Sequence, residues 1–137
     1  MSLNEEDRKV IVALELDKVD KILAQLDVQI KSELWDMAAN RLYYALFHAV
    51  SAMLIYDHHE VGTHRGAVNK FSLYYVKEGI FTKEEGRLYA RLQRLREDGD
   101  YNCSIEVEQE EVEEKIEPTR QLIEKIKQYI AKTNRNV

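Results

Sequence analysis

Apolar residues in the first part of the chain recur at steps of three and four, which is the spacing of one face of an α-helix. The first series is Val12, Leu16, Val19, Leu23, Leu26 and Ile30. Asn4 precedes it as a candidate N-cap, and the acidic residues that follow Asn4 suit the positive end of a helix dipole. The pattern predicts a helix from about residue 5 to Lys31, with one apolar face packed against other helices.

A second apolar series follows directly, and its residues are Trp35, Ala39, Leu42, Leu46, Ala49, Met53 and Tyr56. Ser32 is a candidate N-cap for this segment, and the helix should end near Asp57, before Gly62. Residues 1–61 contain no glycine and no proline, so neither strong helix breaker interrupts the two predicted helices.

The second half of the chain also has helical spacing. One helix should cover residues 64–78, because Thr63 is a suitable N-cap and Gly79 a suitable stop. The last helix should cover about residues 108–132, with Pro118 inside it.

Another helix is predicted between these two. Thr82 and Glu85 match the capping-box pattern at its start, and it should reach about Glu97. Five helices joined by short connections predict an all-α protein. We expect a single domain over residues 1–137, built as an up-and-down four-helix-bundle core with an additional helix.

The composition fits a small helical domain. The chain has 137 residues, of which 45% are hydrophobic and 33% are charged. No apolar run approaches the ~18 residues of a membrane span, and no signal peptide is recognisable. Cys103 is the sole cysteine, which excludes an internal disulfide, and as a lone thiol it is a weak candidate nucleophile. We therefore expect a cytoplasmic protein with no membrane association.

Charge is distributed unevenly along the chain. The net charge of −5 does not suggest a general nucleic-acid binder. However, residues 64–96 hold eight Lys and Arg against three acidic residues, whereas residues 105–117 hold seven Glu and one Lys. Arg87, Arg91 and Arg94 would share one helix face that is able to follow an RNA backbone. A solvated cationic face that balances the acidic last helix is the alternative interpretation.

Arg41 and His48 are the main candidates for chemistry. They are seven positions apart, which returns almost to the same direction on a helix. Both should lie at the edge of the buried face, where Ala45 and Ala52 would leave a shallow groove. The structural alternative is that Arg41 extends into water or to a carboxylate, and that His48 is a boundary residue with one satisfied nitrogen.

Several neighbours are candidates for supporting roles. Asn40 could donate to a phosphate oxygen, or it could lie on a solvated helix surface, and Tyr44 flanks the same stripe. Asp100 is one turn from Arg96 and could pair with it, or it could orient Arg41 or His48 instead. In the first case, the next residue along the chain, Tyr101, would anchor that helix end.

Three histidines near the middle of the chain raise the question of a metal site. His58, His59 and His64 lie close in sequence, with Glu60 among them, and imidazoles suit zinc or nickel. Their spacing matches no strong metal motif, and histidines in loops are commonly just exposed. The sequence also lacks a Walker loop, a dinucleotide fingerprint and a nucleophile elbow. We therefore predict neither a metal nor another cofactor.

Four segments, in this order, resemble the HEPN superfamily, in particular its small stand-alone bacterial members. They are AANRLYYALFHAVSAML (38–54), THRGAVNKF (63–71), VKEGIF (76–81) and RLREDGDY (94–101). Arg41 and His48 match the superfamily's R-x(4–6)-H signature with six intervening residues. The resemblance covers about residues 10–130.

The resemblance implies a four-helix-bundle core with an additional helix. It also implies homodimers that bring two Arg/His sets together across a groove. Many HEPN proteins are metal-independent ribonucleases, often the toxin of a pair with a minimal nucleotidyltransferase, and others keep the fold without proven catalysis. By this resemblance, Arg41 and His48 would be the catalytic pair.

The chemistry of RNA cleavage fits these residue types. RNA carries its own nucleophile, the 2′-OH, and a histidine is able to accept its proton or to protonate the leaving oxygen. An arginine holds the phosphate in a fork and stabilises the charge of the transition state. The sequence therefore predicts an endoribonuclease that leaves a 2′,3′-cyclic phosphate. The alternative is a non-catalytic module that binds a nucleotidyltransferase partner or a small ligand.

Overall fold

The computed structural model describes residues 3–101 and 107–135, and every regular element in these ranges is a helix. The elements are α1 (Glu5–Lys31), α2 (Trp35–Tyr56), α3 (His64–Phe71), the π-helical segment η1 (Ser72–Val76), α4 (Lys83–Tyr101) and α5 (Gln109–Arg135). The prediction of an all-α protein is therefore confirmed.

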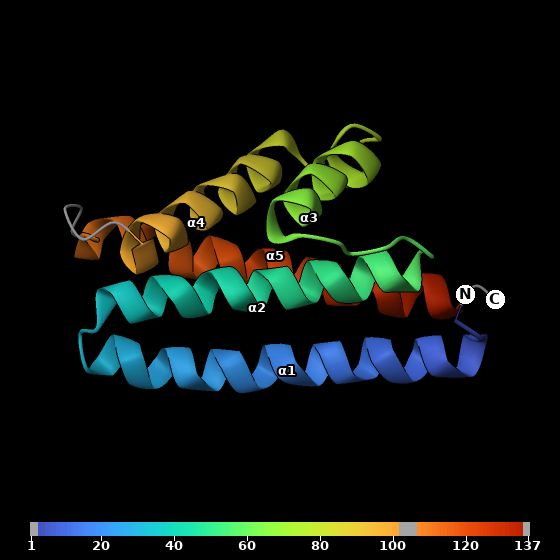
Figure 1. Ribbon diagram of the computed structural model, residues 1–137, viewed down its shortest axis with the longest axis horizontal. Helices are drawn as coiled ribbons and strands as arrows, with labels where there is room; N and C mark the ends of the chain where they lie inside the picture. Colours follow the sequence, from blue (N-terminus) through green and yellow to red (C-terminus); the bar gives the residue numbers. More distant parts are fainter. Residues whose placement is uncertain (1–2, 102–106, 136–137) are drawn as a thin grey trace.

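The four long helices form an antiparallel bundle in which α2 is central. Consecutive long helices α1, α2, α4 and α5 alternate in direction, and α3 lies over the C-terminal half of α2 (Figure 1). Helix α2 contacts α1, α3, α4 and α5. It takes this central place because it is the most apolar of the helices, with buried residues on almost every side. The predicted four-helix core with an additional helix is confirmed.

The apolar series predicted from the sequence form the core. Val19 and Leu26 of α1 and Leu42 and Leu46 of α2 are fully buried. Every other residue of the two series is either buried or packed against this core. A fully buried leucine of this kind contributes roughly 1.5–3 kcal/mol of transfer free energy, so these stripes supply much of the driving force for folding.

Three helix starts have the caps that the sequence predicted. Asn4 Oδ1 accepts the backbone N–H of Asp7 at 2.8 Å, and the Thr63 hydroxyl accepts that of Gly66 at 2.9 Å. At the start of α4, Thr82 and Glu85 satisfy each other's backbone N–H groups at 2.7 and 3.1 Å, which completes the capping box.

Other boundaries differ from the predictions. Ser32 is the C-cap of α1 rather than the N-cap of α2, and its N–H bonds back to Val28. Glu33 then takes a left-handed backbone conformation with φ of 57°, and Leu34 becomes the N-cap of α2. The chain therefore turns through a helix-terminating motif, which a search for N-cap residue types does not detect.

The prediction of one α-helix over residues 64–78 is wrong. The segment changes to π-helical bonding at Ser72, and Lys77 N–H bonds to Ser72 O. Its end is as expected, because Gly79 adopts a φ of 80°. Helix α4 continues to Tyr101, beyond the predicted end at Glu97.

Helix α5 continues through Pro118. No helix within the described ranges is both long enough and apolar enough to cross a membrane.

Candidate functional site

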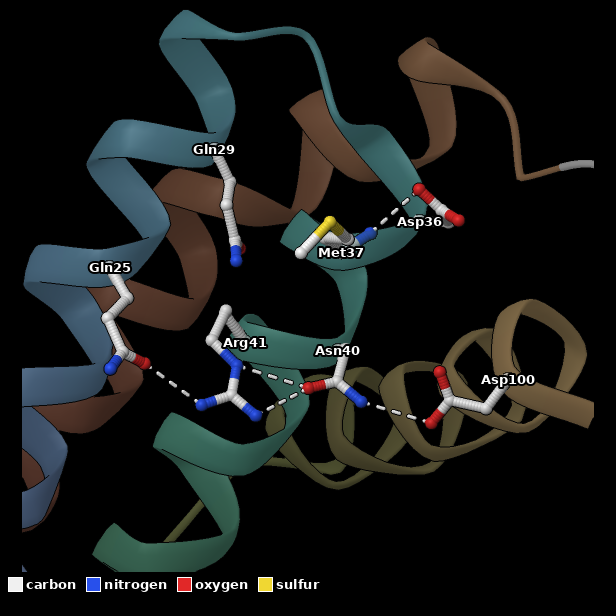
Figure 2. A pocket seen from close by; sticks show the side chains of 7 residues that line it. All are labelled: Gln25, Gln29, Asp36, Met37, Asn40, Arg41 and Asp100. Atoms are coloured by element: carbon white, nitrogen blue, oxygen red, sulfur yellow. Dashed lines mark hydrogen bonds between the residues drawn. The ribbon is translucent and has the colours of Figure 1, made fainter.

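Arg41 is held in a fixed orientation by neutral groups. Its Nη1 donates to Gln25 Oε1 of α1 at 3.0 Å, and its Nε and Nη2 donate to Asn40 Oδ1 at 3.1 and 2.6 Å (Figure 2). Neither partner is a carboxylate, and no ion pair of Arg41 occurs among the described residues. The cation is therefore positioned without being neutralised, and further N–H groups are left for an anion.

A chain of contacts fixes Arg41 from the side of α4. Asn40 Nδ2 donates to Asp100 Oδ2 at 3.0 Å (Figure 2). The side-chain amide that accepts hydrogen bonds from Arg41 is therefore itself oriented by a carboxylate. Asp100 Oδ2 also lies 3.7 Å from Arg96 Nη1. Asp100 therefore contacts Arg96 and, through Asn40, is linked to Arg41. Asn40 is half-buried and is engaged in this network.

A cavity of about 470 Å³ opens beside Arg41. Its walls come from α1, α2 and α4, and the residues that line it are Gln25, Gln29, Asp36, Met37, Asn40, Arg41 and Asp100 (Figure 2). The lining is mostly polar, which suits a hydrophilic ligand. His48 does not line this cavity, so the two signature residues do not share it.

His48 is oriented by a carboxylate that the sequence analysis did not identify. Its Nδ1 lies 2.6 Å from Glu15 Oε2 of α1, and the two side chains are only 16% and 22% exposed. When Nδ1 carries the proton and donates to Glu15, Nε2 of the neutral ring has the lone pair. A carboxylate on Nδ1 fixes the orientation of the ring, which is the arrangement used by histidines in general acid–base catalysis.

The groove expected beside Ala45 and Ala52 does not form, because both residues are fully buried. Gln25, which accepts from Arg41, and Glu15, which contacts His48, both come from α1, so α1 runs alongside this stripe of α2. The small side chains serve the close packing of the bundle instead of leaving an open channel.

Tyr44 connects the two parts of the site. Its ring lies 5.5 Å from the guanidinium carbon of Arg41 and 5.6 Å from that of Arg96. The His48 ring is 6.4 Å away on the following turn. Both arginines are close enough for cation–π attraction to this half-buried ring. Tyr44 therefore lies between the arginines and the histidine, and its supporting role stays a prediction.

His64 also belongs to this cluster. As the first residue of α3, it packs edge-on against Tyr44 and Phe47, with ring centroids 5.6 and 4.7 Å away. Burial lowers the pKa of the His64 imidazole, and the charges of Arg96 and His48 lower it further. The neutral ring is thus favoured near physiological pH.

The other two histidines point elsewhere. His59 stacks on Tyr74 with ring centroids 3.9 Å apart, whereas His58 Nε2 lies 3.5 Å from Glu5. Within residues 3–101 and 107–135, no group of three or more His, Cys, Asp or Glu side chains is placed to hold a metal ion. The three histidines that are close in sequence therefore do not form one cluster.

Arg87, Arg91 and Arg94 are exposed on α4. The three arginines precede Arg96 by nine, five and two residues. These spacings place each of them roughly opposite Arg96 around the helix axis, so they face away from Arg96 and the Arg41 network. Arg87 also forms an ion pair with Glu84. The structure does not bring this face to the Arg41 cavity. Tyr101 is the last residue of α4, and its side chain lies outside the part that the structure describes.

Comparisons with known proteins identify several relatives of this chain. A UPF0332 protein of Thermotoga maritima is 36% identical over 101 residues, which cover 74% of this chain and 76% of the relative. Two proteins of Methanocaldococcus jannaschii, named "Putative toxin MJ0605" and "Putative toxin MJ0142", are 30% and 26% identical over 125 and 119 residues. These matches cover 91% and 87% of this chain, and 92% and 81% of the relatives.

The family model described as HEPN domain matches residues 16–129, which include Arg41, His48, His64 and Asp100. With this match over most of its length, the chain belongs to the HEPN domain family.

Proposed function

We propose that this protein is a metal-independent endoribonuclease that cleaves RNA by attack of the 2′-OH on the neighbouring phosphate. The observation that carries this proposal is the state of Arg41. Its guanidinium is fixed by Gln25 and Asn40, both neutral, at the wall of a polar cavity. An oriented cation of this kind suits the two oxygens of a phosphodiester, because a guanidinium donates to them as a fork.

His48 supplies the proton transfer in this proposal. With Glu15 on Nδ1, the ring is oriented and its Nε2 is available to exchange a proton with the substrate. The 2′-O–H bond breaks as the 2′-oxygen bonds to phosphorus. The bond from phosphorus to the 5′-oxygen then breaks, and that oxygen takes up a proton. The products are a 2′,3′-cyclic phosphate and a 5′-OH, and Arg41 stabilises the charge on the phosphate oxygens during the step.

Asn40, Tyr44 and Asp100 act as positioning residues, since each holds Arg41 directly or through one intermediate. The exposed face of Arg87, Arg91 and Arg94 would contact RNA phosphates farther along the strand, because it points away from the cavity.

The names of two relatives contain the word toxin, which supports a role as the toxin of a toxin–antitoxin or defence pair. A minimal nucleotidyltransferase is then the expected partner protein. We also propose a cytoplasmic homodimer whose two-fold axis brings two Arg41/His48 sets together. Light scattering on the purified protein tests the dimer, and a monomeric mass would contradict it.

The proposal is tested by incubating a mixed-sequence RNA with purified protein in EDTA. We expect cleavage by the wild type and at least about 100-fold slower cleavage by His48→Ala, the lower range for the loss of general acid–base catalysis. His59→Phe is the matched control, since His59 stacks on Tyr74 away from the site. Equal rates for wild type and His48→Ala would refute the proposed role. An inactive wild type would favour the non-catalytic binding module.

A further inference from the structure

His64 and His48 lie on the same pair of aromatic rings. Phe47 is 4.7 Å from His64 and 5.2 Å from His48, and Tyr44 is 5.6 Å from His64 and 6.4 Å from His48, each measured between ring centroids. These contacts bring together residues from α2 and from the start of α3. The two imidazoles thus flank one small aromatic surface, with Arg41 over its Tyr44 ring.

The start of α3 fixes the position of His64. The hydroxyl of Thr63 caps the helix by accepting the N–H of Gly66, so His64 begins the first turn. Its ring also meets Tyr43 edge-on at 5.9 Å, and Tyr43 is fully buried. His64 is only partly buried, so its ring is accessible from solvent as well as fixed in position.

The two histidines have opposite electrostatic surroundings. His48 Nδ1 contacts the carboxylate of Glu15 at 2.6 Å. His64 instead faces the buried cation of Arg96, and no carboxylate bonds to it among the described residues. On α4, Glu97 is paired with Arg65 at 3.3 Å. Tyr43 and Tyr44 face the ring from α2.

An acid and a base in one site need such a division of environments. A histidine beside a cation is favoured in its neutral form, which accepts a proton. A histidine whose Nδ1 contacts a carboxylate has its ring oriented so that Nε2 is the nitrogen that meets the substrate. The direction of the His64 pKa agrees with the first role, because burial and Arg96 both lower it.

We propose that His64 is a second catalytic residue, the general base for the 2′-OH of RNA, and that His48 is the general acid for the leaving 5′-oxygen. This inference rests on the proposed ribonuclease function and deepens it. The 2′-O–H proton passes to a ring nitrogen of His64 while the 2′-oxygen bonds to phosphorus. As the bond from phosphorus to the 5′-oxygen breaks, that oxygen takes a proton from the His48 imidazolium. No further reactant is required.

The test uses RNA with a single 5′-bridging phosphorothiolate, in which sulfur replaces the leaving 5′-oxygen. A thiolate leaves without protonation, so this substrate needs the base but not the acid. Cleavage of this RNA and of ordinary RNA is compared in EDTA for the wild type, His48→Ala and His64→Phe. The phenylalanine keeps an aromatic ring against Tyr44 and Phe47, and His64→Gln serves as a second variant.

We expect the sulfur substrate to restore His48→Ala to within about tenfold of the wild type. Both His64 variants should stay at least about 100-fold slow on either RNA. Wild-type rates in the His64 variants would overturn the inference while leaving the proposed function intact. Rescue of the His64 variants rather than His48→Ala would also overturn it, since the roles would be exchanged. A wild type that cleaves neither RNA would remove the proposed function and this assignment with it.

Discussion

At the scale of single residues, Arg41 is oriented by groups that carry no charge. Gln25 and Asn40 aim the guanidinium, and neither neutralises it, so its full charge is available to a ligand. A lysine at this position would keep the charge but lose the planar fork. The shape of the guanidinium is therefore expected to matter as much as its charge.

We predict that Arg41→Lys restores little of the cleavage that Arg41→Ala removes. Asn40→Leu should have an intermediate effect, because it breaks the link to Asp100 but leaves the cation in place. Single-turnover rates on one RNA, with circular dichroism to confirm the helical fold, measure both effects. A lysine variant as fast as the wild type would mean that charge alone suffices.

His64 should make the stability of the protein depend on pH. Its folded-state pKa lies below the ordinary 6.5 of the unfolded chain, so the unfolded state binds more protons between these two values. Stability should therefore fall as pH drops through 6.5 towards the folded-state pKa. Urea unfolding at pH 7.5 and pH 5.5 should give a smaller difference for His64→Phe than for the wild type. An equal difference in both proteins would contradict this.

The sequence predicts that Arg41 and His48 lie on one side of a helix, because spacing alone defines direction there, and both residues are on α2. Their catalytic roles stay a prediction. The sequence did not identify Glu15 or Gln25, which meet these residues only through the packing of α1 against α2. His64 was considered only as a metal ligand, since its contacts with Tyr44 and Phe47 depend on where α3 lies. Contacts of this kind are not encoded in local periodicity.

At the scale of helices, ends with a local chemical signal were predicted and ends without one were not. The Thr82 and Glu85 capping box is a short-range pattern, and it forms as expected. The change to π-helical bonding at Ser72 has no such pattern. It accompanies the burial of Tyr75, whose hydroxyl donates to Asp57 at 2.7 Å. The irregular segment is therefore associated with tertiary contacts rather than with a local sequence pattern.

The capping box at the start of α4 should contribute measurably to stability. Burial alone would raise the pKa of Glu85, but hydrogen bonds from Lys125 and Thr82 outweigh burial and lower it. We predict that Thr82→Ala reduces the free energy of unfolding by about 1 kcal/mol. Thr82→Ser, which keeps the hydroxyl, should be nearly neutral. Urea denaturation measures both variants, and equal losses would show that the hydroxyl is not the stabilising group.

At the scale of the whole molecule, the acidic net charge and the exposed basic face of α4 have different consequences. The net charge of −5 repels RNA in general, so binding depends on local cationic groups. Arg87, Arg91 and Arg94 are the exposed candidates, and they lie outside the Arg41 network. They should therefore affect affinity without altering the chemical step.

We predict that reversing all three of these arginines to Glu weakens RNA binding and flattens its dependence on salt. Each lost contact with single-stranded RNA should reduce the slope of log affinity against log salt by about 0.7. Filter binding between low and moderate salt, using the His48→Ala background to prevent cleavage, gives this slope. An unchanged affinity and slope would assign this face to solvent.

The central claim concerns the fate of the 2′-OH, and the ends of the reaction products report on it directly. A defined RNA oligonucleotide is incubated with the purified protein in EDTA, and the products are identified by mass spectrometry. Attack by the 2′-OH predicts a 2′,3′-cyclic phosphate on one fragment and a 5′-OH on the other, with no cleavage where a 2′-deoxynucleotide precedes the linkage. Fragments that end in a 3′-OH and a 5′-phosphate, or cleavage at the 2′-deoxy position, would contradict it.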